Sequence, residues 1–385
     1  MRILYISTPF FADCDFPLIK SLQAKGVDIT YLILLAPYSL RSTLIDIKEQ
    51  INETAIFPAT RYSELKVYEQ YMDMSKVYVA NRTSSKSYSL SYWKLNWLIN
   101  KFIKKGQYDI VHSDTLIGKM QGFMYRNAKH WIQTIHDPFP HTGENTKKKI
   151  NRYKYVIGKS KKIILLNENQ LEKFCSHYCV EKKDVFTNRL GVYDNIRTFV
   201  NPEMKELPQN ILFFGRISPY KGIEYLCEAM KIVHEVLPEA TLTIAGGGKL
   251  YFDTTEYDKL PYISITNRYI GMEELASLLT KCTVTVCPYT DATQSGVIMT
   301  SFSLCKPVVA TNVGGLGEMV DNGRTGLLVP PKNAKALAEA IIEILADDNK
   351  CQRMKENIRN DYFINEKSWN CIADKYINVY KTVLK

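Results

Sequence analysis

The stretch Phe214-Gly215-Arg216-Ile217-Ser218-Pro219-Tyr220-Lys221-Gly222 joins a predicted strand at residues 211–214 to a predicted helix at residues 222–236. In a parallel sheet covered by helices, such a loop leaves the carboxyl end of its strand. Arg216 is therefore expected at that edge, and Lys221 beside the start of the helix. Two cations next to the free amides of a helix N-terminus suit a phosphate or diphosphate. The alternative is an ordinary loop whose basic residues are only solvated.

Three further strand-to-helix turns of similar character follow in the chain. The first is AGGG at residues 245–248, where the missing side chains let the backbone approach a ligand closely. The second, PYTDATQSGV at residues 288–297, leads into a helix whose first amides can face an anion. The third is the glycine-rich TNVGGLGE at residues 311–318. Four such loops in one domain indicate a nucleotide-diphosphate ligand rather than four unrelated turns.

Apolar, strand-like runs alternate with amphipathic helical patterns along the 385-residue chain. The length exceeds one ordinary core, and the alternation indicates parallel sheets covered on both faces. We therefore predict two doubly wound Rossmann-like α/β domains facing each other across a cleft. Residues 1–200 form the first domain, residues 201–209 the proline-bracketed linker, and residues 210–365 the second domain. Residues 53–90 are less regular and are interpreted as an insertion or a mobile loop region.

The net charge of +10 is concentrated in the first half, since residues 1–200 carry +12 and residues 201–385 carry −2. One basic patch lies at residues 147–162, and a second at residues 93–105 includes Trp93 and Trp97. These patches are either solvated helix faces, with the tryptophans packed on the core, or contacts to an anionic membrane surface. No nucleic-acid-binding motif accompanies the charge, so no nucleic acid is expected as a partner.

Nine cysteines without close pairing do not make a disulfide framework. The short grouping of Asp13 with Asp15, and that of Cys175, His177 and Cys179, lack the further ligands of a metal site, so no metal is expected. The longest apolar stretch, residues 29–40, is shorter than the roughly 18 residues of a spanning helix. We expect a soluble cytoplasmic protein, with peripheral attachment to the inner membrane face left open by the basic patches.

The sequence resembles the retaining glycosyltransferases of the two-domain GT-B fold, in particular glycosyltransferase family 4, also described as glycosyl transferases group 1. The motifs that carry the resemblance are FGRISPYKG, TIAGGG, YIGMEELASLL, CPYTDATQSGV, KPVVATNVGGLGEMV and NGRTGLLVPP, between residues 214 and 331. In the first half it is weaker and rests on YDIVH (108–112) and TIHDP (134–138). The resemblance also implies that the closing helix, residues 366–385, packs back on the N-terminal domain.

The resemblance implies a nucleotide-sugar donor held by the second domain, a UDP-sugar rather than a GDP-sugar, with no separate cofactor. Arg216 and Lys221 match the family's diphosphate-binding pair and are assigned as catalytic. The other donor-binding residues implied are Gly215, Gly246, Gly247, Tyr269, Ile270, Thr293, Gln294, Ser295, Gly296, Val297 and Thr300.

One departure from the family concerns two glutamates, eight positions apart, that commonly precede the KPVV motif. Here the corresponding residues are Ala292 and Thr300. The second glutamate usually holds the donor ribose, and a threonine can offer only neutral hydrogen bonds in its place. Ribose recognition is therefore expected to be altered or weaker, with Thr293, Gln294 and Ser295 supplying sugar contacts.

In the front domain, His136 at the end of a predicted strand is the catalytic candidate. Phe10, Asp137 and His141 are assigned to contacts with the acceptor or the transferred sugar. His112 ends another strand. Both His112 and His136 could instead be core histidines whose hydrogen bonds are satisfied within the protein.

The resulting prediction is a retaining hexosyltransferase that moves a sugar from a nucleotide diphosphate to an acceptor hydroxyl. Its acceptor is a sugar or a lipid-linked sugar, in cell-surface polysaccharide or glycolipid biosynthesis. The alternatives are a nucleotide-sugar epimerase of the same fold, for which residues 290–300 offer few carboxylates, and a non-catalytic nucleotide-sugar or glycan-binding protein.

Overall fold

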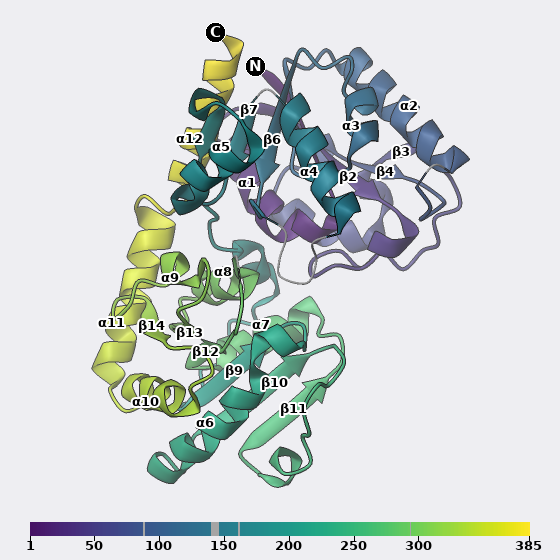
Figure 1. The fold of residues 1–385 in the computed structure, drawn as a ribbon. Coiled ribbons are helices and arrows are strands. Elements are labelled where there is room, and N and C mark those ends of the chain that lie inside the picture. Colours follow the sequence, from purple (N-terminus) through teal and green to yellow (C-terminus); the bar gives the residue numbers. More distant parts are fainter. Residues whose placement is uncertain (88, 140–145, 161, 293) are drawn as a thin grey trace. The chain divides into compact units, whose positions relative to one another are not determined.

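The computed structural model describes residues 1–87, 89–139, 146–160, 162–292 and 294–385. The chain divides into two compact units (Figure 1). Unit 1 comprises residues 1–191 together with residues 369–385, and unit 2 comprises residues 192–368. Among the described residues, no helix combines the length and the apolar character needed to cross a bilayer.

Unit 1 is built on an eight-stranded sheet in the order β3-β4-β2-β1-β5-β6-β7-β8. All neighbouring strands are parallel except β3 and β4. From β4 to β7 the order is that of a doubly wound sheet, with its reversal between β1 and β5. The strands are β1 (Arg2–Ser7), β2 (Asp28–Leu35), β3 (Ile56–Pro58), β4 (Val77–Asn81), β5 (Ile110–Ser113), β6 (His130–Ile135), β7 (Lys162–Leu165) and β8 (Val185–Thr187).

Short apolar runs form these strands because both faces of a parallel sheet are covered, so successive side chains are all buried. In β1, the five residues from Ile3 to Ser7 are buried. The helices of unit 1 are α1 (Ala12–Ala24), α2 (Leu90–Gly106), α3 (Lys119–Met124), α4 (Lys147–Lys159), α5 (Leu171–Tyr178) and α12 (Trp369–Leu384).

The closing helix α12 packs against α1, as the resemblance implied (Figure 1). Its buried face includes Trp369, Ile372, Tyr376 and Tyr380, which repeat at the spacing of one helix face. Lys25 of unit 1 forms an ion pair of 2.7 Å with Asp374 on this helix.

Unit 2 contains a six-stranded, fully parallel sheet in the order β11-β10-β9-β12-β13-β14, with its reversal between β9 and β12. Its strands are β9 (Asn210–Phe214), β10 (Thr241–Gly246), β11 (Ile263–Asn267), β12 (Val284–Cys287), β13 (Val308–Thr311) and β14 (Gly326–Val329). Its helices are α6 (Ile223–Val236), α7 (Met272–Lys281), α8 (Gly296–Ser303), α9 (Leu316–Met319), α10 (Ala334–Leu345) and α11 (Asp348–Arg359), which continues into a π-helix (Asn360–Ile364). Both units are therefore the doubly wound α/β domains that the sequence predicts.

The division between the units falls between Gly191 and Val192, so the segment 201–209 lies within unit 2. The residues just after the division already pack on this unit, because Ile196 is fully buried in the cluster that contains Leu212 and Leu279. The segment itself is fixed by the backbone, since Leu207 N donates to Lys281 O at 2.8 Å.

Candidate functional site

The loops after β9 and β10 lie directly against each other at the carboxyl edge of the unit 2 sheet. Gly215 N donates to Ala245 O at 3.0 Å, and Ile217 N donates to Gly247 O at 3.1 Å. A Cβ at Gly246 would lie 1.8 Å from Gly215 O, so only glycine allows this approach. Gly215 has φ +116°, a left-handed conformation that favours glycine. Three of the predicted donor-binding glycines therefore come together beside the switch point of the sheet.

Arg216 and Lys221 leave the same loop with different surroundings. Arg216 is exposed, and its Nη2 lies 3.5 Å from the Tyr220 hydroxyl. Lys221 is only 8% exposed, and its Nζ lies 3.6 Å from the ring centroid of Tyr289. Burial, together with the nearby positive charge of Arg216, lowers the pKa of Lys221 to about 8. Within the described ranges, neither cation forms an ion pair with a carboxylate. Two neighbouring positive charges are thus left for an anion to neutralise.

The N-terminus of α8 adjoins this loop. A Cβ at Gly215 would lie 3.4 Å from Val297 Cγ2, in the first turn of α8. The N-cap residue Ser295 is buried, and its side chain accepts no hydrogen bond from the helix amides. A side chain at Gly296 would meet the Tyr193 ring at 2.9 Å. The first amides of α8 therefore complete a set of donors suited to a diphosphate.

Thr300 lies one turn further along α8, where its hydroxyl donates to Gly296 O at 2.8 Å. Its oxygen can still accept a bond, but its hydrogen is already used within the helix. Ala292, at the position of the family's other glutamate, is buried, and its carbonyl accepts a hydrogen bond from Gly315 N. Gln294 is half-buried, and Thr293 lies outside the described residues.

Tyr269 and Ile270 occupy the loop after β11. A Cβ at Gly247 would lie 3.4 Å from Tyr269 N, which places this backbone beside the glycine turn. The Tyr269 side chain is exposed, whereas Ile270 packs against the core cluster that contains Leu212 and Leu275. Tyr289, which was not among the predicted site residues, lies under the Lys221 ammonium. Its position directly after β12, in the quoted CPYT motif, is the sequence signal that could have identified it.

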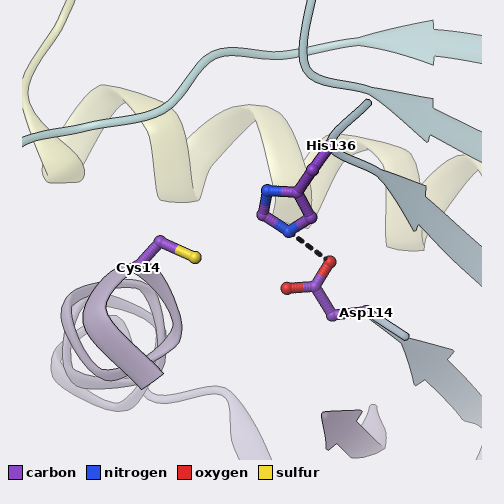
Figure 2. Close-up of side chains that lie close together, drawn as sticks. All are labelled: Cys14, Asp114 and His136. Atoms are coloured by element: carbon purple, nitrogen blue, oxygen red, sulfur yellow. Dashed lines mark hydrogen bonds and ion pairs between the residues drawn. The ribbon is translucent and has the colours of Figure 1, made fainter. Parts of the chain in front are cut away.

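In unit 1, the first turn of α1 and the carboxyl ends of β5 and β6 bring together Cys14, Asp114 and His136 (Figure 2). One ligand atom from each lies within 4.8 Å of the others. His136 Nε2 is 2.7 Å from Asp114 Oδ1, and the Phe11 ring stacks on the imidazole at 4.4 Å. Burial opposes the charged form of His136, but Asp114 outweighs it, so the pKa of His136 is raised above 6.5. Asp114 and His136 therefore form a buried acid–base pair.

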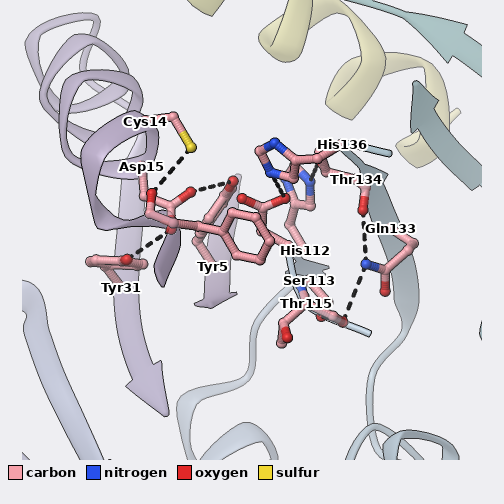
Figure 3. Close-up of polar contacts among 12 residues, drawn as sticks. Tyr5, Cys14, Asp15, Tyr31, His112, Ser113, Thr115, Gln133, Thr134 and His136 are labelled. Carbon is pink, nitrogen blue, oxygen red and sulfur yellow. Dashed lines mark hydrogen bonds and ion pairs between the residues drawn. The ribbon is translucent and has the colours of Figure 1, made fainter. Parts of the chain in front are cut away.

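A second carboxyl group, Asp15, lies close enough to Asp114 to interact with it, and Figure 3 shows its contacts. It accepts hydrogen bonds from Tyr5 Oη at 3.1 Å and from Tyr31 Oη at 2.9 Å. Burial, and then the negative charge of Asp114, raise the pKa of Asp15 well above its usual range. Burial likewise raises the pKa of the Cys14 thiol, which donates to Phe11 O at 3.1 Å. Burial thus favours the protonated forms of Asp15 and Cys14, and the cluster is a hydrogen-bonded acid–base network.

His112 differs from His136 because both of its nitrogens are engaged in the core. Nδ1 lies 2.7 Å from the Tyr380 hydroxyl, and Nε2 lies 2.7 Å from Thr134 Oγ1. Burial lowers its pKa to about 3, so the ring is neutral. His112 is therefore a core histidine that ties β5 to α12.

The remaining predicted residues of unit 1 are placed as follows. Phe10 is exposed in a short 3-10 turn (Pro9–Phe11), and Asp137 is half-buried next to His136. His141 lies outside the described residues. Asp114, Phe11 and Cys14 were not predicted for the site, and only the strand-end position of Asp114, two residues after His112, offered a sequence signal.

Comparisons with known proteins agree with this architecture. Residues 208–347 match the model of the family described as Glycosyl transferases group 1. An uncharacterised glycosyltransferase of Methanocaldococcus jannaschii is 26% identical over 309 residues, which cover 72% of this chain and 76% of that protein. A glycogen synthase of Mycobacterium tuberculosis is 28% identical over 180 residues, which cover 45% of this chain and 42% of that protein.

Two solved structures show the same fold over essentially the whole chain. Sucrose-phosphate synthase from Thermosynechococcus elongatus has a TM-score of 0.66 at 17% identity, with 99% of each chain covered. HepE of Anabaena, solved in complex with UDP-glucose, has a TM-score of 0.67 at 16% identity, with 99% of this chain and 100% of that chain covered. Residues 208–347 thus match the Glycosyl transferases group 1 model, and the whole chain has the GT-B fold of these solved structures.

Proposed function

We propose that the enzyme transfers a hexose from a nucleoside-diphosphate sugar, a UDP-sugar in the first instance, to an acceptor hydroxyl with retention of configuration. The observation that carries the proposal is the pair Arg216 and Lys221, two cations without an ion-pair partner in the described chain, beside the glycine turns and the start of α8. HepE of Anabaena, which shares the fold, was solved with UDP-glucose and with UDP, which supports this choice of donor.

The chemistry follows from where charge develops. Breaking the bond between sugar and diphosphate leaves negative charge on the phosphate oxygens, and preorganised cations and amides stabilise it most as the bond breaks. Arg216 and Lys221 supply the cations, and Gly215, Gly246 and Gly247 let backbone approach the phosphates. Thr300 can accept a ribose hydroxyl but cannot replace the charge of a carboxylate.

Retention fits a front-face substitution, in which a departing phosphate oxygen takes the proton of the acceptor hydroxyl. In this scheme His136, oriented by Asp114, is a catalytic residue that binds the transferred sugar or the acceptor. Phe10, Asp137 and His141 are proposed as further contacts to the acceptor or sugar.

One observation favours a second candidate, transfer with inversion. A histidine bonded to a buried carboxylate at 2.7 Å is the arrangement of a general base, which would deprotonate the acceptor directly. The anomeric configuration of the product separates the two candidates. The comparisons do not favour an epimerase or a non-catalytic binding protein.

We also propose that the acceptor is a sugar or lipid-linked sugar of surface polysaccharide or glycolipid biosynthesis, and that the enzyme attaches peripherally to the cytoplasmic face of the inner membrane. Trp93 and Trp97 of α2 are 46% and 51% exposed, and Lys101 Nζ lies 5.2 Å from the Trp97 ring centroid. Aromatic and basic side chains on one helix suit a membrane surface. In the basic patch at residues 147–162, Lys161 and the side chain of Lys148 lie outside the described residues.

The test begins with binding of UDP and GDP, followed by a screen of nucleotide sugars for transfer. Arg216→Ala and Lys221→Ala should each lower turnover by about 10²–10³, because each removes a charge-assisted contact to the leaving group. Arg353→Ala and Lys231→Ala are matched controls, since these cations of unit 2 lie beside carboxylates, with Lys231 Nζ 3.1 Å from Glu228. Normal turnover in both site variants would show that the donor binds elsewhere.

A further inference from the structure

A cavity of about 350 Å³ opens in unit 1 where α2, α3 and α4 approach the loop after β5. Its lining includes Tyr92 of α2, Lys119 at the start of α3, and Asn151, Arg152 and Tyr155 of α4. The loop that forms one wall begins at Asp114, the partner of His136, and ends at Gly118. Ile117 and Gly118 of this loop line the cavity, so one short loop connects the cavity to the acid–base pair of this unit.

Arg152 is held in place at the cavity wall. Its Nη1 donates to Leu116 O at 3.4 Å, and its Cγ lies 3.4 Å from the position that a Cβ on Gly118 would occupy. Gly118 has φ +102°, so the loop bends under the arginine in a conformation that glycine favours. Within the described residues the guanidinium makes this one hydrogen bond, so its other donors can serve a ligand.

Lys119 and Arg152 have no carboxylate partner within ion-pair distance among the described residues. The other cavity walls add neutral polar groups, the Asn151 amide and the Tyr92 and Tyr155 phenols. A fork of guanidinium donors beside an ammonium group matches a phosphate or a carboxylate, whereas a neutral sugar gains nothing from the two charges.

We propose that this cavity binds the anionic group, phosphate or carboxylate, of the acceptor, so that the enzyme glycosylates a negatively charged acceptor. Identifying the bound molecule as the acceptor rests on the proposed function. The existence of the anion site does not depend on it. Lys119 and Arg152 are then specificity-determining residues, because they bind a group that takes no part in the transfer.

The first experiment measures binding without any donor. Glucose 6-phosphate, inorganic phosphate and glucose are titrated by calorimetry into the full chain, its Arg152→Gln and Lys119→Gln variants, and a Lys129→Gln control. Lys129 is an exposed lysine of the same unit, paired with Asp109 at 3.4 Å. We expect the phosphate compounds to bind and glucose not to bind. Affinity should fall at least tenfold in both site variants, stay unchanged in the control, and weaken with added salt.

The Arg152→Lys variant distinguishes a lost contact from a folding defect. It keeps the positive charge but loses the planar guanidinium, so it should bind glucose 6-phosphate with intermediate affinity. Lys119 is exposed, so its replacement tests the site without disturbing the core. Equal binding of glucose 6-phosphate by the wild type and both glutamine variants would overturn the proposal, as would binding of glucose that equals that of its phosphate.

Two further arms separate the outcomes. Vesicles containing phosphatidic acid are added as competitors of glucose 6-phosphate, with phosphatidylcholine vesicles as the comparison. Competition identifies a lipid-borne phosphate, and the absence of competition identifies a free sugar phosphate.

UDP titration of the same variants reports on the donor site alone. If Arg152→Gln loses the phosphate ligand but no nucleotide sugar is used, the anion site stands and the proposed function fails. If neutral acceptors are glycosylated as well as anionic ones, the proposed function stands and the anionic-acceptor proposal fails.

Discussion

Because Lys221 is buried, we predict that donor binding depends on pH in a range where ordinary lysines stay protonated. Its side chain is 8% exposed, and burial lowers its pKa to about 8 in the free protein. A diphosphate beside Nζ favours the charged form and raises this pKa on binding. Above pH 8, the free protein must therefore take up a proton on Lys221 before it can bind UDP with full affinity.

The size of the effect follows from this pKa. The protonated fraction of a group with a pKa of about 8 falls about tenfold between pH 7 and pH 9. If the bound form stays protonated, the Kd for UDP should rise by about the same factor. The neighbouring groups do not share this range, because burial raises the pKa of Cys287 to about 11 and raises that of Tyr289 well above 10. A phosphate monoester ionises near pH ~6, so the ligand keeps its charge above pH 7.

The assay is calorimetric titration of UDP at half-unit steps from pH 7 to pH 9.5, in wild type, Lys221→Arg and Lys221→Met. Arginine stays charged throughout, so Lys221→Arg should show no trend with pH. Lys221→Met should bind weakly at every pH, with a loss of about tenfold or more, because a charge-assisted hydrogen bond contributes roughly 1.5–3 kcal/mol. The reasoning fails if the wild-type Kd is flat, or if Lys221→Arg shows the same rise.

Three more predictions follow from other parts of the molecule. Asp114→Asn should lower the pKa of His136, measured by NMR titration, because the imidazole loses the charge and hydrogen bond of Asp114 while burial still opposes its charged form; the partly exposed Asp109→Asn is the control, and an unchanged His136 pKa would contradict the pairing. Replacing Trp93 and Trp97 with Ser should weaken binding to anionic vesicles in a flotation assay, and equal binding of wild type to neutral and anionic vesicles would remove the membrane proposal. Thr300→Glu should change UDP affinity at least threefold, whereas Thr300→Ser should not; if Thr300→Glu, Gln294→Ala and Ser295→Ala all match wild type, this segment does not line the donor site.

The strand-to-helix alternation was predictable because buried parallel strands leave a local signal, a short apolar run between polar turns. The predicted strand at residues 211–214 is β9 (Asn210–Phe214), and the glycine turns after β9 and β10 do meet. β4 (Val77–Asn81) was missed within residues 53–90, where short 3-10 turns interrupt the periodicity around it.

The acid–base network of unit 1 could not be predicted, because it depends on long-range convergence rather than on spacing. In the sequence Asp15 formed only a short grouping with Asp13, yet the packing of α1 buries it, with hydrogen bonds from Tyr5 and Tyr31. Asp114 meets His136 only because β5 and β6 are neighbours in the sheet and end at the same edge. Sequence reasoning identified His136 from its strand end but could not supply the partner that sets its pKa.

The geometry of α8 clarifies what the missing glutamates change. With Ala292 buried and the Thr300 hydroxyl bonded to its own helix, the segment offers the donor a neutral surface and the first amides of α8. Neither Ala292 nor Thr300 carries a negative charge, so neither would oppose a diphosphate bound nearby. The cations Arg216 and Lys221 then act on the phosphates without competition from a carboxylate at either position. Under the proposed function, the diphosphate should therefore contribute most of the donor affinity, and the ribose comparatively little. We therefore expect the protonation state of Lys221 to affect donor affinity more than a contact to the ribose does.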